Sequence, residues 1–498
     1  MRLFDAGERP MHTDEAVNGC LLGAMLEGET YRYDPQDRHG PVLYFASYPL
    51  VRAFGVTRLA ELEPWLVRLV PAIFGTALLL ALPLFAGTSP VGRGRRTPPP
   101  NTPAASDDAA LPLFATALWL GFAAPFVYYG RYWIHETIFV LLTFLLIASV
   151  WRYLRSPHTG WAILAGVCAG LMPATKETVA ITGLAGFAAL VGTWWLARPT
   201  SAALPQRWPR DVLLALVLAL FTAALLFSSF GRHPEGLIDA ARAMLRFVGR
   251  ARGEGHEKPW FTYLGWWLQP NLRSLPWFGW TLAPFAVVGA VAAWRQRRTA
   301  PMGIFWLLFT GAHLAIYSAI PYKTPWLALN FFAPCAVLGG IGFQAACAAL
   351  PERGRRAITV GLLALVTLAL ARETQRLCFR FPAEPSNPLA YSPTVPDIEH
   401  LQARVEQFAL TRPEGWQTVV QVVGDDYWPL PWYLRHFSSV GYWSTPPLEL
   451  SAPVVISTPA LAETVARRLG PGWSQQFFGL RPEVLVVVFL RQPPGTVP

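Results

Sequence analysis

Two adjacent carboxylates near the start of the chain, Asp14 and Glu15, have the type and spacing to do chemistry. They precede a stretch that predicts a helix running to about Glu27. One interpretation is structural, with Thr13 near the N-cap and two acids that complement the positive end of the helix dipole. The other is chemical, because a carboxylate can serve as a general base or bind a metal ion. Taken alone, the pair favours the structural interpretation by about two to one.

A second candidate, Arg38-His39, stands at the head of an apolar stretch that ends near Phe54. This stretch is too short and too interrupted to span a bilayer, which favours an interfacial helix. Arg38 and His39 could bind a lipid phosphate, or could extend toward water. Both interpretations stay open.

Further ionisable residues lie at the ends of longer apolar stretches. They are Arg131, His135, Glu136, Lys176, Glu177 and Lys323. Ionisable groups at membrane depth are costly and therefore suggest function, although an interfacial ion pair is the alternative for each. Together these cations and carboxylates predict a place where an anionic headgroup would bind.

The long loop 231–276 contains His256, Trp260 and Tyr263. A histidine beside aromatic residues could bind a metal or carry a proton, although a lone histidine is more often structural. The aromatic residues could stack on a sugar ring or lie in the headgroup layer.

Composition indicates the class of protein that carries these residues. The chain has 498 residues, 53% hydrophobic and only 14% charged, whereas soluble domains carry about 25% charged residues. Apolar stretches predict ten helical spans, at 64–87, 111–129, 134–150, 160–174, 177–197, 211–230, 277–294, 301–319, 326–349 and 356–371. The net charge of +10 comes mostly from arginines in short loops, which argues against nucleic-acid binding.

The arginines gather in every second loop. They are Arg93, Arg95 and Arg96; Arg152 and Arg155; Arg198, Arg207 and Arg210; Arg295, Arg297 and Arg298; and Arg353, Arg355 and Arg356. The positive-inside rule places these loops in the cytoplasm, so the candidate residues lie on the outer face of the plasma (inner) membrane. An outer N-terminal segment also leads us to expect a further apolar span upstream of Met1.

After about residue 372 the sequence changes character. It predicts strands at 417–423, 453–457 and 483–490 and a helix at 460–469, which together indicate a small α/β domain. The predicted organisation is an outer segment 1–63, a membrane domain 64–371 and an extracytoplasmic domain 372–498. In the last of these, Asp425 to Tyr433 mixes acids with aromatic residues that could contact a carbohydrate or pack the domain.

These motifs resemble the GT-C glycosyltransferases, in the branch of protein O-mannosyltransferases, aminoarabinose transferases and the flippase-associated subgroup of archaea and bacteria. The resemblance rests on Arg2–Ala16 with its Asp-Glu pair, Arg38–Tyr44, Glu63–Ala72, Lys176-Glu177, His256 with Lys258–Trp260, and Tyr322–Trp326. It implies an α-helical polytopic membrane protein with about ten transmembrane helices. In the family a transmembrane helix precedes the Asp-Glu loop. Some relatives also have a carboxylate that binds a metal ion at the position where this chain has Arg38.

The resemblance implies inverting transfer of a hexosyl or pentosyl group from a polyprenyl-phosphate sugar to a hydroxyl on a glycan, lipid or protein. Asp14 would be the base and Glu15 its support. Donor phosphate would bind Arg131, Lys176, Lys323 and His39, and the sugar or acceptor would contact His256, Trp260 and Tyr263. A divalent metal ion is an open cofactor, with Glu15 and His256 as candidate ligands.

Two other functions stay open. A lipid-linked-sugar flippase or transporter component predicts charges and broken helices near the bilayer midplane and inverted internal symmetry, and the sequence shows neither. A non-catalytic membrane partner could keep the same fold without the activity.

The arginine pattern makes a testable prediction about topology. Single cysteines near residues 95 and 297 should be protected from an impermeant outside reagent, because the positive-inside rule places them in the cytoplasm. Cysteines near 256 and 430 should react. Labelling of 256 and 297 from the same side would contradict the topology.

Overall fold

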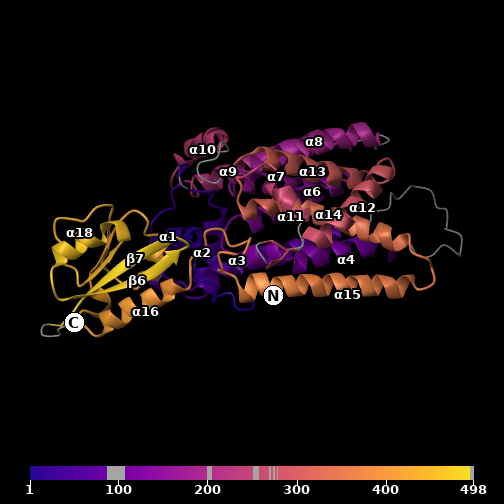
Figure 1. Cartoon of the computed structure of the whole chain (residues 1–498). Helices are drawn as coiled ribbons and strands as arrows, with labels where there is room; N and C mark the ends of the chain where they lie inside the picture. The colour runs from indigo at the N-terminus through magenta and orange to yellow at the C-terminus, as the bar shows by residue number, and fades with distance from the viewer. Residues whose placement is uncertain are drawn as a thin grey trace. The chain divides into compact units, whose positions relative to one another are not determined.

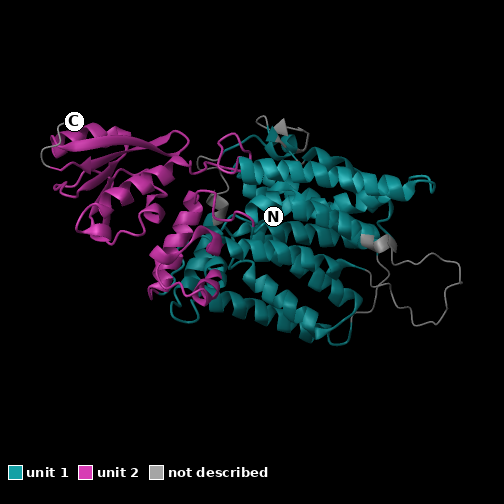
Figure 2. Ribbon diagram, turned by 90° about the horizontal axis from the view of Figure 1, so that it is seen from below, with its two compact units in different colours: residues 1–3, 30–46, 68–380 teal, residues 4–29, 47–67, 381–498 magenta. Residues whose placement is uncertain are grey.

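The computed structural model describes residues 1–36, 38–86, 107–198, 205–250, 257–268, 271–272, 275–277 and 279–493 (Figure 1). The chain forms two compact units (Figure 2). Unit 1 comprises Met1–Leu3, Thr30–Ala46 and Arg68–Arg380, and unit 2 comprises Phe4–Glu29, Ser47–Val67 and Phe381–Pro498. The sequence-based division kept residues 1–63 apart from the C-terminal domain, whereas the structure places much of that segment in the same unit as the domain.

Unit 1 is helical. Its elements, including α2 and α3, which continue into unit 2, are α2 (Val42–Ala53), α3 (Pro64–Ala81), η2 (Leu82–Phe85), α4 (Asp107–Phe122), α5 (Ala124–Tyr129), α6 (Glu136–Arg155), α7 (Thr159–Leu171), α8 (Val179–Ala197), α9 (Trp208–Phe227), α10 (Gly236–Arg250), α11 (Thr262–Leu268), α12 (Gly279–Arg295), α13 (Pro301–Ala319), η3 (Pro325–Ala328), α14 (Leu329–Ala348), α15 (Arg355–Thr374) and the π-helical η4 (Gln375–Arg380). Two short strands, β1 (Asn271–Leu272) and β2 (Leu275–Pro276), pair antiparallel. A helix lies at each of the ten predicted apolar stretches, as expected.

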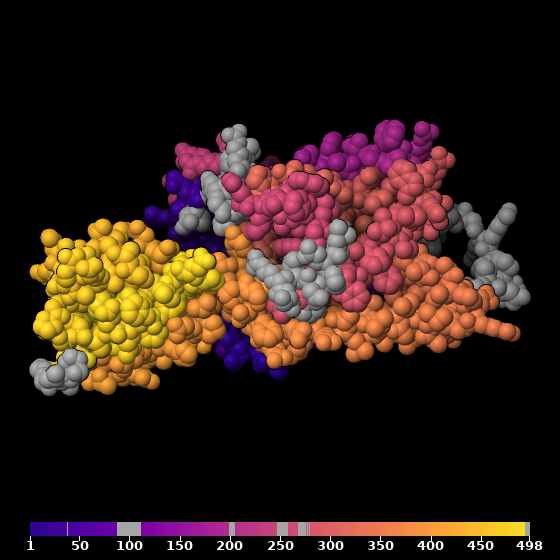
Figure 3. All heavy atoms as spheres, in the orientation of Figure 1, coloured from indigo at the N-terminus to yellow at the C-terminus, as the bar shows by residue number. Residues whose placement is uncertain are grey.

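Seven helices of the described residues are long and apolar enough to cross a membrane. They are Pro64–Phe85, Glu136–Arg155, Val179–Ala197, Trp208–Phe227, Pro301–Ala319, Pro325–Ala348 and Arg355–Arg380. Apolar side chains remain exposed on several of them, such as Leu220 in α9 and Leu368 in α15. In Figure 3 α15 lies along the surface of unit 1. Extended apolar surface of this kind suits contact with lipid. The chain is a multi-pass membrane protein.

Glycines let α12 and α14 pack closely. A Cβ added at Gly289 would collide with the carbonyl oxygen of Leu338, and one added at Gly342 would collide with that of Phe285. In a lipid bilayer the hydrophobic effect does not drive helices together. They associate instead through small residues, which let their backbones approach closely. The two helices therefore form a tight pair inside unit 1.

Two helices of unit 1, α10 and α11, lie in the loop 231–276 and were not predicted. The loop 231–276 contains α10, whose Leu237, Ile238 and Leu245 are exposed while Arg242 forms an ion pair with Asp239 at 3.1 Å. Its charged residues interrupt the apolar pattern, so neither a spanning helix nor a strand was indicated.

Unit 2 combines both ends of the chain. Its elements are α1 (Thr13–Leu26), η1 (Leu59–Glu61), α16 (Asp397–Leu410), η5 (Gly415–Gln417), β3 (Val420–Val423), α17 (Leu430–Tyr433), β4 (Val440–Trp443), β5 (Val454–Ser457), α18 (Pro459–Leu469), β6 (Trp473–Arg481) and β7 (Val484–Arg491). The sheet order is β4-β3-β5-β7-β6. Strand β3 is parallel to β4 and β5, whereas β7 is antiparallel to β5 and β6.

The C-terminal α/β domain is confirmed, since β3, β5, β7 and α18 form where the sequence predicts them. Their apolar side chains build one core, formed by Val423, Val455, Ala462, Val465, Val487 and Phe489. Strands β4 and β6 were not predicted. Both lie at edges of the sheet and keep polar or glycine residues, which hides the strand pattern.

The aromatic residues of α17 pack inside unit 2. Trp432 is buried, and a Cβ at Gly19 of α1 would lie only 2.6 Å from its ring. The guanidinium group of Arg435 also stacks on the Trp432 ring, with its central carbon 4.4 Å from the ring centroid. Trp432 therefore serves packing, and Gly19 is the residue that lets α1 approach it.

The close packing of α12 and α14 can be tested by adding one methyl group. Gly342→Ala should lower the melting temperature of the purified protein in detergent, because overpacking costs about 1–3 kcal/mol. Gly311→Ala in α13 is the matched control, since a Cβ there meets nothing within 4 Å. Equal melting temperatures for the two variants would contradict the packing.

Candidate functional site

In unit 2, the N-terminus of α1 is held by a capping box. His12 has extended backbone angles, and its Nδ1 accepts a hydrogen bond from the Asp14 backbone N–H at 3.1 Å. The Glu15 carboxylate accepts from the His12 backbone N–H, also at 3.1 Å. The sequence-based interpretation placed Thr13 near the cap, but the structure has His12 there, because the imidazole Nδ1 supplies the acceptor that a cap requires.

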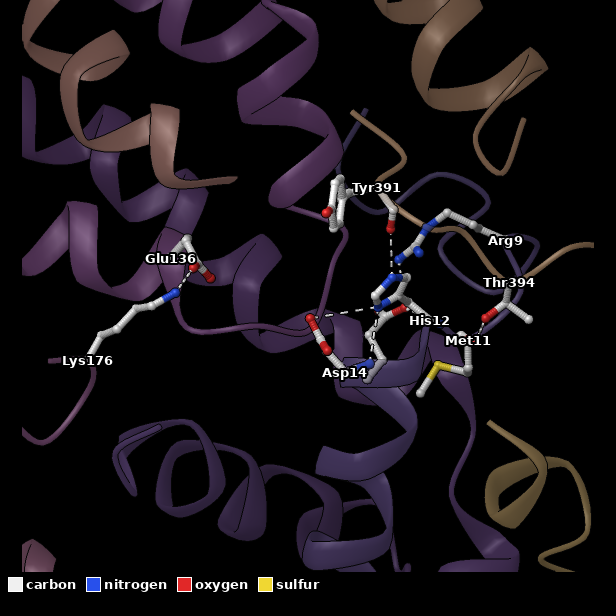
Figure 4. Close-up of polar contacts among 9 residues, drawn as sticks. Arg9, Met11, His12, Asp14, Glu136, Lys176, Tyr391 and Thr394 are labelled. Carbon is white, nitrogen blue, oxygen red and sulfur yellow. Dashed lines mark hydrogen bonds and ion pairs between the residues drawn. The ribbon is translucent and has the colours of Figure 1, made fainter. Parts of the chain in front are cut away.

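The two carboxylates of the Asp-Glu pair lie in different environments. The Glu15 side chain is fully buried and accepts a hydrogen bond from the Arg9 guanidinium at 2.8 Å. The Asp14 side chain is 47% exposed, and its carboxylate lies 3.8 Å from His12 Nδ1 (Figure 4). Glu15 is thus fixed by a charge pair and a cap, while Asp14 can be reached by water or a substrate hydroxyl.

In unit 1, Lys176 forms a buried ion pair with Glu136 at the first residue of α6 (Figure 4). Both side chains are almost completely shielded from solvent. This is the ion-pair alternative that the sequence left open. A phosphate that binds Lys176 would have to share the ammonium group with Glu136.

The neighbouring residue Glu177 forms a second buried group in unit 1. Its carboxylate contacts His39 Nδ1 at 2.9 Å and accepts a hydrogen bond from the Tyr33 hydroxyl at 3.0 Å. Burial alone would raise the pKa of Glu177, but the charge and hydrogen bond of His39, with the charge of Lys176, lower this pKa to about 2. The His39 side chain stays partly exposed and could still meet an anion.

His135 lies beside His39, with 5.3 Å between the ring centroids. Its Nε2 lies 3.0 Å from the Gly40 carbonyl oxygen, to which the neutral ring can donate. Burial, together with the charges of His39 and Lys176, lowers the pKa of His135 well below its usual value. His135 is therefore neutral and fixes the loop that carries His39.

Lys323 differs from Lys176. It is only 1% exposed, and its ammonium group donates to the Ile320 carbonyl. In the part of the chain that the structure describes, no carboxylate forms an ion pair with Lys323. Burial lowers the pKa of Lys323, as expected for a cation away from water without an anionic neighbour. It is the predicted phosphate ligand with the greatest need for an anion.

The remaining predicted ligands have separate surroundings. Arg131 is buried, donates to the Cys378 carbonyl at 2.7 Å and stacks over Phe379 at 4.4 Å. Tyr263 is buried and donates to the Thr324 carbonyl at 2.9 Å, so its ring offers no open face to a sugar. Trp260 is 64% exposed and retains such a face.

His256 lies outside the described residues. Over the ranges that the structure describes, no three His, Cys, Asp or Glu side chains are grouped as a metal ion would require. Glu15, the other candidate metal ligand, already contacts Arg9 and the backbone of His12. The sequence did not reveal the partners of Glu136 and Glu177, because no spacing rule links residues so far apart in the chain.

No protein-family model matches the chain, and no curated protein matches it. The solved structures that are similar to it over nearly its whole length include ArnT from Cupriavidus metallidurans in the apo state, and the same protein bound to undecaprenyl phosphate. The match to the apo structure has a TM-score of 0.60 and 16% sequence identity, and it covers 98% of this chain and 95% of the ArnT chain. The match to the lipid-bound structure has a TM-score of 0.60 and 15% sequence identity, and it covers 98% of this chain and 96% of the ArnT chain. The chain has the ArnT fold.

This likeness confirms the predicted fold class, a GT-C-like polytopic membrane protein. The shared coverage of ArnT includes both the helical region and the C-terminal domain. Identity of 16% shows the fold alone, so the activity has to be argued from the residues of this chain.

The buried Glu136–Lys176 pair makes a stability prediction. Lys176→Met should destabilise unit 1 by about 3–5 kcal/mol, because Glu136 is left charged and buried without its partner. The double variant Lys176→Met with Glu136→Gln should recover much of this loss in thermal unfolding of the purified protein. A double variant no more stable than the single one would show that the charge pair is not the cause.

Proposed function

We propose that the chain is a GT-C-type glycosyltransferase, which moves a sugar from a polyprenyl-phosphate donor to an acceptor hydroxyl on the outer face of the membrane, with inversion. The observation that carries the proposal is the contrast between a fixed Glu15 and a solvent-reaching Asp14 at the start of α1. The ArnT fold, one structure of which is bound to undecaprenyl phosphate, supports the class of donor.

The proposed reaction is a single displacement. The acceptor oxygen forms a bond to the anomeric carbon, and the bond from that carbon to the phosphate oxygen breaks. Asp14 takes the proton of the acceptor hydroxyl, and the electron pair of the broken bond leaves with the polyprenyl phosphate. Attack from the face opposite the leaving group inverts the anomeric centre.

The leaving phosphate gains negative charge and so needs cations. Lys323 suits this role because it is buried and its described partner is a carbonyl rather than a carboxylate. His39, half exposed beside Glu177, can add a hydrogen bond. Arg131 and Lys176 are further candidates, although Lys176 is already neutralised by Glu136.

Asp14→Asn tests the base assignment. Transfer of radiolabelled sugar from polyprenyl phosphate in proteoliposomes should fall by about 10²–10⁴-fold, the usual contribution of general acid–base catalysis. Asp14 is not the capping residue, so the folding cost is limited to its interaction with the helix dipole, about 0.3–1 kcal/mol. Glu8→Gln is the control, because it removes an exposed charge from the same segment.

Near-normal transfer by Asp14→Asn would remove the base assignment. Movement of the labelled lipid across the bilayer without transfer would instead identify a flippase. Neither activity in the wild-type protein, with a stable complex with another membrane protein, would identify a non-catalytic partner.

A further inference from the structure

Three hydrogen bonds within unit 2 hold the residues just before α1. The Met11 backbone N–H donates to the Tyr433 hydroxyl at 2.8 Å, and the Met11 carbonyl accepts from the Thr394 hydroxyl at 2.8 Å. His12 Nε2 lies 2.9 Å from the Tyr391 carbonyl oxygen. Figure 4 shows His12 between Asp14 and Tyr391, with Thr394 beside Met11. Both backbone groups of Met11 and one ring nitrogen of His12 are therefore bound to the C-terminal part of the chain.

The bonds of His12 define its tautomer. A carbonyl oxygen can only accept, so Nε2 must carry the hydrogen that it donates to Tyr391. Nδ1 accepts from the Asp14 backbone N–H and is therefore unprotonated. His12 is neutral, and the two bonds fix both the position and the plane of its ring. The Asp14 backbone is in turn fixed by the ring.

Burial makes this arrangement rigid. Met11, His12, Thr394 and Tyr433 are all buried, whereas the Asp14 carboxylate is half exposed. Hydrogen bonds shielded from water are costly to break without replacement. A fixed and dry support thus lies next to a carboxylate that meets solvent.

The C-terminal support, which we call the strap (residues 391–394), is itself anchored to the sheet. Immediately after it, the Val395 N–H donates to the Leu480 carbonyl at 3.0 Å. The Asp397 carboxylate accepts from the Gly479 N–H at 2.6 Å. Leu480 and Gly479 both belong to β6. The position of the strap is therefore determined by the fold of the C-terminal domain.

We propose that His12 is a positioning residue, which couples the orientation of Asp14 to the C-terminal domain through the Tyr391 carbonyl. The inference rests on the proposed function, in which Asp14 is the base. A general base must lie within hydrogen-bond reach of the proton that it removes, and a misplacement of 1 Å can cost about 10²-fold in rate. The bond from His12 to Tyr391 supplies that placement, whereas the bond to the Asp14 N–H supplies the helix cap.

Two substitutions separate these roles. In His12→Asn the side-chain oxygen takes the place of Nδ1, so the helix cap is kept and the bond to Tyr391 is lost. In His12→Gln the amide group reaches the place of Nε2, so the bond to Tyr391 is kept and the cap is weakened. Thr394→Val is a matched variant that removes one strap bond and leaves both contacts of His12 in place.

The test measures kcat and KM in the proteoliposome assay, the melting temperature, and hydrogen exchange of the backbone amides at residues 11–14. We expect His12→Asn to keep the melting temperature but lose about tenfold or more in kcat, with little change in the KM for the donor. His12→Gln should melt lower yet keep the higher kcat of the two. Exchange of the Met11 amide should become faster in His12→Asn and in Thr394→Val.

A crossed result of this kind supports positioning, because a purely structural role would lower kcat only in parallel with stability. A wild-type kcat in His12→Asn would overturn the positioning proposal. It would not affect the assignment of Asp14 as the base, which the Asp14→Asn variant tests separately. If Asp14→Asn itself transfers sugar at a near-normal rate, the base assignment fails, and hydrogen exchange still tests the strap. If the wild-type protein transfers no sugar, the proposed function fails. Unchanged exchange at Met11 in both His12→Asn and Thr394→Val would overturn the coupling to the C-terminal domain.

Discussion

The structure depends on one constraint: a charged side chain can be buried only where a partner compensates the loss of water. Glu136 has Lys176, Glu177 has His39 and Tyr33, and Glu15 has Arg9. The pairs of Glu136 and Glu177 join segments that lie apart in the sequence, so they hold the fold as well as the charges. The same constraint distinguishes two residues that remain available for chemistry. Asp14 is a carboxylate that reaches solvent, and Lys323 is a buried cation whose ammonium group, among the described residues, donates to a carbonyl and forms no ion pair.

The parts of the fold that the sequence predicted are those determined by the length and continuity of apolar runs. A helix that crosses a bilayer needs about 20 apolar residues, and no polar pattern can imitate that signal. Strands β5 and β7 were predicted for a similar reason, since both faces are buried and their residues are continuously apolar. Strands β4 and β6 and helix α10 have mixed residues, because each presents one side to another environment, and their patterns were therefore ambiguous.

The candidate site was predicted by residue type but not by partnership. Asp14, Glu15, Lys176 and Lys323 could be identified because ionisable residues near apolar runs are unusual. Their different roles could not, because these depend on contacts such as Glu15 with Arg9 and Lys176 with Glu136, which only the folded chain brings together. His12 was missed as a cap, since histidine is not among the favoured N-cap residues. The shared unit of residues 4–29 and 381–498 had no signal in the sequence.

The Asp-Glu pair explains how neighbouring acids acquire different roles. Successive residues of an α-helix point about 100° apart, so when one side chain faces the interior the next turns away from it. Glu15 faces inward, where Arg9 and the His12 N–H fix it, and Asp14 is turned toward solvent. Glu15 also accepts a hydrogen bond from the backbone N–H of His12, and the ring of His12 in turn caps the helix by accepting from the Asp14 N–H. Glu15 can therefore influence chemistry at Asp14 without touching a substrate, because it determines where the helix begins.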